Sequence, residues 1–275
     1  MAFAQNNDDN IPNSPYGSAG DLKGKTVVVN CFVSKAGKEW KDEEKASVLA
    51  KELDGLSWLQ RQAVKWRTSA INFEVVNIGL EKDITVDHID HAFDMNKIRK
   101  LRTHWATFAL NAAGYSKVFS FYDTLKAAHK ADNVVVMVFA NENGRSYAQP
   151  TIEQIVKYSK EFFLEGAVVY KTGYNGQNMY SGTVIHELLH LFGAWDMYLS
   201  ETRSSDIDRQ IKGAFQHSIM LNDHDNNINQ FSIDQMTGWC IGWTKSYWPW
   251  YEMFRTSNQK EYWKSIPGTE NRSEK

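Results

Sequence analysis

The sequence predicts an α+β (mixed α/β) fold built around a central, twisted and mainly parallel β-sheet. Segments dense in β-branched residues alternate with segments of helical periodicity over the first two thirds of the chain. The run Asn133–Ala140 (NVVVMVFA) is apolar at almost every position, which is typical of a strand covered on both faces. With 275 residues, 42% hydrophobic and 23% charged, the chain is long and apolar enough to bury a large core.

The first third of the chain is expected to contain a strand, a long helix and a second strand. Residues 1–22 are rich in Asn, Asp, Ser and Gly and predict a flexible tail. Lys25–Val33 is a strand by its β-branched content, and Ala70–Ile78 is the next. Between them, apolar residues step by three and four and predict a helix over Asp42–Arg67. These residues are Leu49, Leu53, Leu56, Leu59, Ala63 and Trp66.

The middle of the chain mixes loops, helices and a short edge strand. The charged stretch Glu81–Asp94 predicts a loop, and helical patterns follow over Met95–Ala113 and Val118–Lys130. After the apolar run, Asn141–Gly144 has the composition of a turn, and Arg145–Ala148 is a candidate edge strand.

The last elements lead to an irregular, aromatic C-terminal part. Thr151–Phe163 has mixed helical character, and Gly166–Lys171 (GAVVYK) predicts a strand. A Gly- and Asn-rich loop, Gly173–Gly182, precedes a helix over Gly182–Phe192. A last helix is expected near Ser232–Trp243.

Composition excludes several classes of function. Lysine plus arginine (31) nearly balance aspartate plus glutamate (33), so no basic field favours nucleic acid or an anionic membrane surface. Two cysteines rule out a disulfide framework. The longest apolar run, Val134–Ala140, is too short for membrane insertion. The start of the chain lacks a basic region followed by an apolar one, so we expect a cytoplasmic protein by default, with secretion after processing or non-Sec export as the alternative.

The segment most indicative of a catalytic or metal-binding site is His186-Glu187-Leu188-Leu189-His190. Positions i and i+4 share one face of a helix, so His186 and His190 can present their imidazoles to one metal ion. Glu187 projects at an adjacent angle and can reach a water molecule instead of the metal. Two neutral imidazoles and a carboxylate suit a tetrahedral zinc site with one open position.

A third ligand is expected a short distance beyond the helix. Gly193 can adopt a left-handed conformation that ends the helix, and Asp196 then returns toward the same ion. In an alternative layout, the third ligand is a glutamate well downstream. The downstream glutamates lack a partner motif, so we rank this layout lower: Glu201, Glu252 and Glu261.

The whole pattern, H-E-x-x-H-x-x-G-x-x-D, resembles the zinc signature of the metzincin metallopeptidases in its variant with aspartate as third ligand, as in snapalysin-type enzymes. The resemblance implies a zincin-like single catalytic domain over residues 23–275. Residues 23–192 would form its upper subdomain and residues 193–275 its lower one. It also implies a Met-turn, for which Met220 in His217-Ser218-Ile219-Met220 fits, although an ordinary core methionine is the alternative. Asn222 stands where some metzincins carry a tyrosine that stabilises the oxyanion, so that role stays unassigned.

This resemblance implies a zinc-dependent endopeptidase. Zinc activates a water molecule, and Glu187 accepts its proton and delivers it to the leaving amine. In metzincins an extended peptide pairs with the edge strand of the sheet, here Arg145, Ser146, Tyr147 and Ala148. An ordinary hairpin end is the alternative for that segment.

Two other classes of function stay open. One is a protein-binding module on a zincin scaffold, and the other is a zinc hydrolase of non-peptide amides. The dense C-terminal aromatics could serve a protein partner, but we favour a hydrophobic cap: Trp239, Trp243, Trp248, Trp250, Tyr251 and Trp263.

A second metal site is a weaker hypothesis. Asp223, Asp225 and Asn227 alternate as in a calcium loop, but Ile228 stands at the glycine position and Asp234 at the glutamate position. An Asx-rich turn therefore fits this stretch better than a calcium site.

Overall fold

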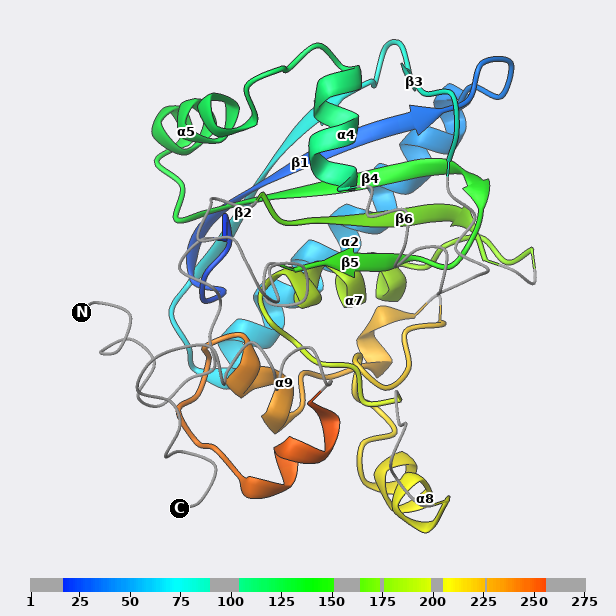
Figure 1. Cartoon of the computed structure of the whole chain (residues 1–275). Helices are drawn as coiled ribbons and strands as arrows, with labels where there is room; N and C mark the ends of the chain where they lie inside the picture. Colours follow the sequence, from blue (N-terminus) through cyan, green and yellow to red (C-terminus); the bar gives the residue numbers. More distant parts are fainter. Residues whose placement is uncertain are drawn as a thin grey trace.

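The computed structural model describes residues 17–89, 104–150, 164–173, 176–198, 205–225 and 227–255. These residues form a mixed α/β fold around a six-stranded sheet in the order β2-β1-β4-β6-β5, with β3 pairing with β1 beyond the end of β2 (Figure 1). All strand pairs are parallel except that of β5 with β6. The expected mainly parallel sheet is therefore confirmed.

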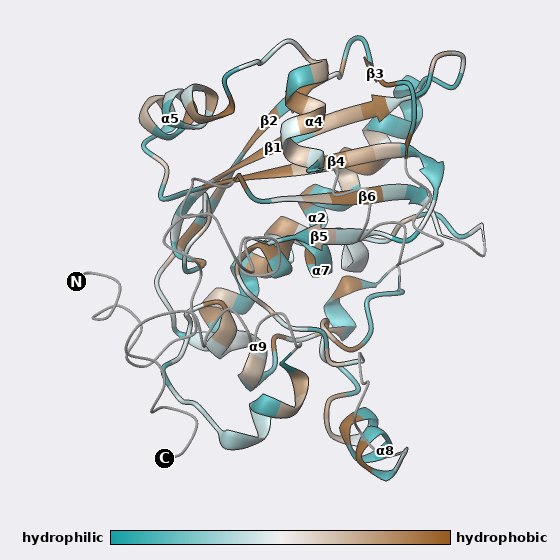
Figure 2. Ribbon diagram, viewed as in Figure 1, coloured by the Kyte–Doolittle hydropathy of each residue, from teal (hydrophilic) through white to brown (hydrophobic). Residues whose placement is uncertain are grey.

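Five strands lie close to the predicted ranges, whereas β3 lies inside the predicted loop Glu81–Asp94, where it pairs with the end of β1. The strand bounds are Gly24–Ser34 (β1), Ile71–Ile78 (β2), Ile84–Thr85 (β3), Asn133–Asn143 (β4), Tyr147–Gln149 (β5) and Gly166–Thr172 (β6). The central strands β1 and β4 are hydrophobic along most of their length (Figure 2). Val28 of β1 is in register with Val75 on one side and Val135 on the other. Apolar residues on both faces place these strands in the middle of the core.

Helices cover both faces of the sheet. The helices are Asp42–Trp66 (α2), Trp105–Ala112 (α4), Val118–His129 (α5), Ser181–Leu191 (α7), Ser205–Ala214 (α8) and Gln235–Cys240 (α9), with 3₁₀ turns at Ile228–Gln230 (η1) and Pro249–Phe254 (η2). Helices α4 and α5 lie on one face of the sheet, and α2 and α7 on the other (Figure 1). Along β1, Val27 and Val29 pack in the α4 and α5 layer, whereas Val28 and Phe32 pack in the α2 and α7 layer.

A glycine in the middle of α2 lets α7 approach closely. A Cβ atom added at Gly55 would lie 2.4 Å from Cγ1 of Ile185, the residue that precedes His186 in α7. The intrinsic cost of glycine inside a helix is therefore compensated by close packing between the two helices. This contact holds the motif-bearing helix against α2.

Several sequence predictions differ from the structure. The predicted turn Asn141–Gly144 is wrong, because β4 continues to Asn143. Polar residues end this strand because their partners lie in the β1–α2 loop: Asn141 Nδ2 donates to the carbonyl of Lys38, and Glu142 pairs with Lys35 and Lys38. The last helix is shorter than Ser232–Trp243: Asp234 caps α9 at its start, and Gly242, whose φ is 81°, follows its end at Cys240.

One helix of the structure, α8, has no counterpart in the sequence predictions, and two predicted helical segments lie partly or wholly outside the described residues. Helix α8 was not predicted, since it contains few apolar residues and buries only Ile211. Residues 95–103 of the predicted helix Met95–Ala113 and the predicted segment Thr151–Phe163 lie outside the described residues.

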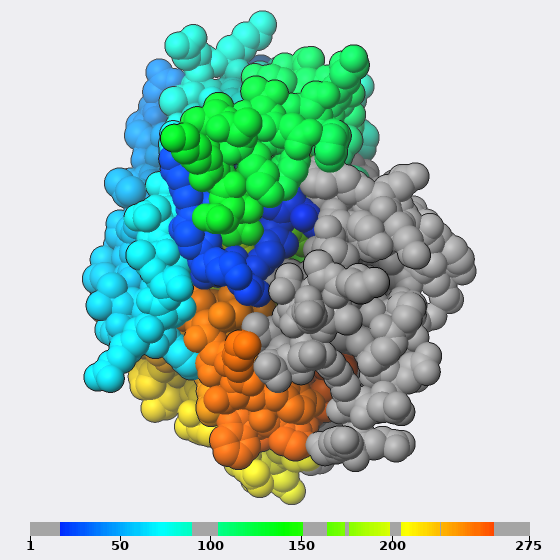
Figure 3. Space-filling model, turned by 90° about the vertical axis from the view of Figure 1, so that its left-hand side faces the viewer, coloured from blue at the N-terminus to red at the C-terminus, as the bar shows by residue number. Residues whose placement is uncertain are grey.

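The start of the described chain packs against its C-terminal part. Residues 1–16 of the predicted tail lie outside the described residues, but Ser18, Ala19 and Leu22 are buried. The amide of Leu22 donates to the carbonyl of Ile241, and Nε1 of Trp243 donates to the carbonyl of Leu22, at 2.9 and 2.8 Å. Figure 3 shows this blue segment lying against the orange C-terminal one. The packed chain thus begins at least four residues before the predicted boundary at residue 22.

Most of the described C-terminal aromatics belong to the core. Trp239, Trp243 and Tyr251 are buried, whereas Trp248 is 49% exposed. Trp263 lies outside the described residues. Among the described helices, none combines the length and the hydrophobicity needed to cross a membrane.

Candidate metal centre

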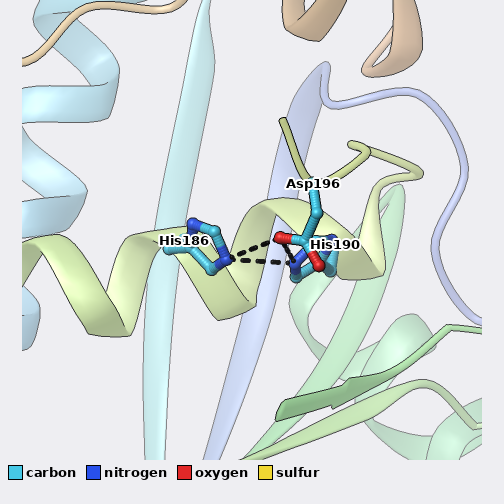
Figure 4. A group of neighbouring side chains, drawn as sticks. All are labelled: His186, His190 and Asp196. Carbon is cyan, nitrogen blue, oxygen red and sulfur yellow. Dashed lines mark hydrogen bonds and ion pairs between the residues drawn. The ribbon is translucent and has the colours of Figure 1, made fainter. Parts of the chain in front are cut away.

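His186, His190 and Asp196 converge on one point at the side of α7. Both imidazoles project from the same face of the helix, and Asp196 returns from the loop that follows it (Figure 4). The Nε2 atoms of His186 and His190 are 3.2 Å apart. Oδ1 of Asp196 lies 3.1 Å from the first and 3.2 Å from the second. The three residues that the sequence singled out are therefore brought together.

The end of α7 brings Asp196 back to the histidines. Gly193 has φ of 91°, a conformation that L side chains rarely adopt. The amide of Ala194 donates to the carbonyl of Leu189, and the amide of Gly193 to that of His190, which together form a Schellman motif. The predicted helix-ending turn at Gly193 is present, and it reverses the chain within three residues of Asp196.

Backbone carbonyls orient both imidazoles. Nδ1 of His186 lies 2.9 Å from the carbonyl oxygen of Ile219, and Nδ1 of His190 lies 2.8 Å from that of Ala194. A carbonyl oxygen only accepts, so each Nδ1 carries the hydrogen. In the neutral ring Nε2 then carries no hydrogen, and its lone pair is directed at the centre of the group. This is the arrangement that orients histidine ligands at metal sites.

The arrangement of the three side chains fits a small divalent cation at its centre. Two Nε2 lone pairs and a carboxylate oxygen face one another, and Oδ1 of Asp196 is buried without a hydrogen-bond partner among the described residues. Ligands about 2.0–2.1 Å from a tetrahedral zinc ion lie about 3.4 Å from each other, close to the distances found here. Within the described part of the chain, this is the cluster of histidine, cysteine and acidic side chains whose ligand atoms lie close enough to hold a metal ion.

Glu187 lies beside the group without joining it. The residue is 5% exposed, and its Oε2 is buried with no hydrogen-bond partner among the described residues. Burial raises the pKa of Glu187 to about 7, although the neighbouring imidazoles of His186 and His190 oppose this effect. A carboxyl group with this pKa can both take up and release a proton near neutral pH.

Met220 is buried and lies in a turn whose preceding residue, Ile219, contacts His186. The amides of Leu221 and Asn222 both donate to the carbonyl of Ser218, which closes the turn. Two carbonyl groups of this turn bind the elements that carry the candidate ligands. That of Ile219 accepts from His186, and that of Met220 accepts from the amide of Met197, next to Asp196, at 3.0 Å. The turn therefore connects the motif helix with the loop that carries Asp196.

Two polar side chains near the centre were not assigned a catalytic role from the sequence. The ring of Tyr198 stacks on the imidazole of His186, with centroids 5.9 Å apart and planes at 18°. Nη2 of Arg145 donates to the Tyr198 hydroxyl at 3.4 Å, and its guanidinium lies 5.8 Å from the centroid of that ring. The sequence signal that could have identified Tyr198 is its position two residues after Asp196. The link to Arg145 requires the tertiary fold.

The candidate substrate strand lies at the edge of the sheet. Tyr147 and Ala148 belong to β5, which pairs with β6 on one side and ends the strand order on the other. Arg145 and Ser146 precede the strand, and Oγ of Ser146 accepts from the amide of Tyr170 at 3.2 Å. Strand β5 is also in contact with α7, so the edge lies next to the helix that carries the histidines.

Acidic groups dominate the electrostatics of the centre. Burial alone lowers the pKa of His186, but Asp196, Asp223 and Glu187 outweigh it and raise that pKa to about 10 in the metal-free protein. Burial likewise opposes ionisation of Asp196, yet His190 and His186 hold its pKa far below the usual range. The centre therefore attracts positive charge, either as protons or as a metal ion.

The side-chain oxygens of the possible calcium loop, from Asp223 to Asp234, bind neighbouring protein groups. Asp223 is buried and pairs with His224. Oδ1 of Asp225 accepts from the amide of Asn227 at 2.7 Å, and Asp234 accepts from the amide and hydroxyl of Thr237. These are local contacts of an Asx-rich turn and a helix cap.

Comparisons with known proteins add a distant structural likeness. No family model matches the chain, and no curated protein matches its sequence. Among solved structures, metalloproteinase-II from Bacteroides fragilis is similar, with a TM-score of 0.41 and 8% sequence identity. The match covers 89% of this chain and 60% of the other, so this chain spans about 60% of the length of that protein.

Proposed function

We propose that the chain is a zinc-dependent endopeptidase of the metzincin type, which hydrolyses extended peptide segments. The observation that carries the proposal is the geometry of four side chains. His186, His190 and Asp196 present three acceptor atoms within about 3.2 Å of one another, and the buried carboxyl group of Glu187 stands next to them unpaired within the described chain.

His186, His190 and Asp196 would hold the ion. When bound, zinc supplies Lewis-acid polarisation of the scissile carbonyl and a water molecule with a pKa lowered to about 7. The choice of zinc follows from the donor set, since two imidazoles and one carboxylate are the ligands of a catalytic site that keeps one position open.

Glu187 is the general base of this proposal. Its raised pKa suits a carboxyl group that accepts a proton from the attacking water and then delivers it to the leaving amine. The carboxyl group of Glu187, which has no hydrogen-bond partner for its Oε2 among the described residues, also favours a hydrolase over a purely structural metal site. A structural site has no use for a base beside its ligands.

Tyr198 is placed to stabilise the oxyanion. Its hydroxyl oxygen accepts from Arg145, so its own hydrogen is available to an oxygen of the substrate. Burial and the carboxylates of Asp196 and Glu187 raise the pKa of Tyr198 well above its usual range, which keeps this hydrogen in place. Tyr198 thereby takes the role that Asn222 left unassigned.

The experiment is a comparison of metal content and peptide hydrolysis in four proteins. Glu187→Gln should retain one zinc ion per chain and lose about 10²–10⁴-fold in kcat. His190→Ala should lose both zinc and hydrolysis. The matched control is His129→Ala, since His129 pairs with Glu74 away from the centre. Unchanged hydrolysis by Glu187→Gln, or by the parent protein after chelation, would contradict the proposal.

A further inference from the structure

A guanidinium group borders the proposed metal centre. In the described part of the chain Arg145 contacts the hydroxyl and the ring of Tyr198, and it forms no ion pair there with a carboxylate. Tyr198 in turn stacks on His186. Arg145 therefore contacts the side chain that itself contacts one of the proposed ligands.

The backbone on both sides of Arg145 is fixed. The amide of Gly144 donates to the carbonyl of Thr172 at 3.0 Å, and a Cβ atom at Gly144 would collide with the ring of Tyr170 at 2.5 Å. On the other side, Ser146 accepts from the amide of Tyr170. Arg145 thus projects from a defined point at the start of the edge strand and not from an unanchored loop.

The two carboxylates whose charges act on Arg145 have other roles in the proposed mechanism. Burial lowers the pKa of Arg145, but the hydrogen bond with Tyr198 and the charges of Asp196 and Glu187 outweigh this effect and raise it. Under the proposed function Asp196 is bound to the metal ion and Glu187 carries the transferred proton. The guanidinium then has no counter-charge of its own at the centre, and an incoming substrate can supply one.

We propose that Arg145 forms a carboxylate-binding subsite beside the metal centre, so that the enzyme prefers peptides with a carboxylate near the scissile bond. The inference rests on the proposed function, because it takes the substrate to be a peptide. A guanidinium fork binds a carboxylate through two parallel hydrogen bonds. The carboxylate comes from an acidic side chain or from the free C-terminus of a short peptide, two sources with the same chemistry.

Two matched sets of peptides distinguish these sources. The first set places Glu or Gln at each position around one scissile bond, with the C-terminus amidated. The second keeps neutral side chains and compares the free C-terminal acid with the amide. In one of these pairs, kcat/KM of the parent should favour the acid about ten- to hundredfold, as expected for hydrogen bonds to a charged group.

The variants link the preference to Arg145. Arg145→Gln should bring the acid-to-neutral ratio close to one, and Arg145→Glu should reverse it in favour of a lysine at the same position. Arg145→Lys should keep part of it, because an ammonium group lacks the fork. The control Arg209→Gln removes an arginine that is exposed on α8 and should keep the full ratio.

Binding to inactive protein separates this inference from the proposed function. In a Glu187→Ala background, dissociation constants of the same peptides should show the same acid preference, and Arg145→Gln should abolish it. Cleavage of all peptides at equal rates, or a ratio unchanged by Arg145→Gln, overturns the subsite and leaves the peptidase. Acid-selective binding by a parent protein that cleaves no peptide overturns the peptidase and retains the subsite.

Discussion

Nδ1 of His190 donates to the carbonyl oxygen of Ala194 across the bend that ends α7, at a distance of 2.8 Å. The orientation of a candidate ligand therefore depends on the conformation of Gly193, whose φ is 91°. Gly193→Ala should destabilise the fold by about 1–3 kcal/mol, because alanine is strained at this φ. It should also weaken zinc binding about 10–100-fold by misplacing an orienting partner.

A glycine elsewhere provides the control for this prediction. Gly213 lies in α8 with open space around its Cα hydrogens, so Gly213→Ala should stabilise the fold by up to about 1 kcal/mol and leave zinc binding unchanged. Chelator competition measures the zinc affinity, and denaturant unfolding measures the stability. Equal zinc affinities in the two variants would contradict the role assigned to Gly193.

Metal binding should compete with protons. The pKa of His186 is about 10 in the metal-free protein, so this imidazole carries a proton at neutral pH that zinc must displace. Apparent zinc affinity should then rise with pH, about tenfold per pH unit for each proton displaced, and zinc should be released on acidification. Chelator competition at pH 6, 7 and 8 measures this dependence. An affinity that is independent of pH would exclude the proton-bound state.

Tyr198→Phe removes a hydroxyl group and keeps the stacked ring. Zinc content should stay unchanged, because the hydroxyl is not among the converging ligand atoms. The value of kcat should fall about 10²-fold, the usual effect of losing one donor to the oxyanion. The control Tyr247→Phe removes a hydroxyl that binds Glu252 on the surface. An equal loss in both variants, or a loss of zinc in Tyr198→Phe, would count against the assigned role.

The residues that could be predicted from sequence are those whose geometry is local. His186 and His190 share a helical face at any α-helical dihedral angles, and Gly193 and Asp196 follow within one turn of chain. The approach of Arg145 to Tyr198 joins residues 53 positions apart and depends on where the edge strand ends. A local pattern carries no information about such a contact.

The fold shows the same division between local and tertiary information. Strands β1, β2 and β6 and helix α2 carry their own periodicity and lie within one or two residues of the predicted bounds. Asn141–Asn143 extends β4 because of partners in another loop, and α8 has too few apolar residues to stand out.

A buried carboxyl group under the sheet should make stability depend on pH. Glu52 of α2 is 2% exposed, and its Oε2 accepts from Nδ2 of Asn30 at 2.6 Å. Burial raises its pKa to about 7 from an ordinary value of 4.5, despite the hydrogen bond from Asn30. The folded state thus binds more protons than the unfolded state between these two values. The free energy of unfolding should therefore fall as pH rises from 4.5 to 7, by about 3 kcal/mol at most from this group.

Glu52→Gln tests this relationship, because an amide cannot ionise and can still accept from Asn30. The variant should be more stable than the parent at pH 8, and the difference should become constant below pH 4.5, where the parent carboxyl group is protonated in both states. Glu43→Gln is the matched control, since Glu43 is exposed in the first turn of the same helix. Urea unfolding at pH 5, 6, 7 and 8 gives the comparison. Both substitutions leave the residues of the metal centre in place, so the difference between parent and variant isolates Glu52. A gain in stability that is the same at every pH would mean that Glu52 ionises as freely in the fold as in the unfolded chain.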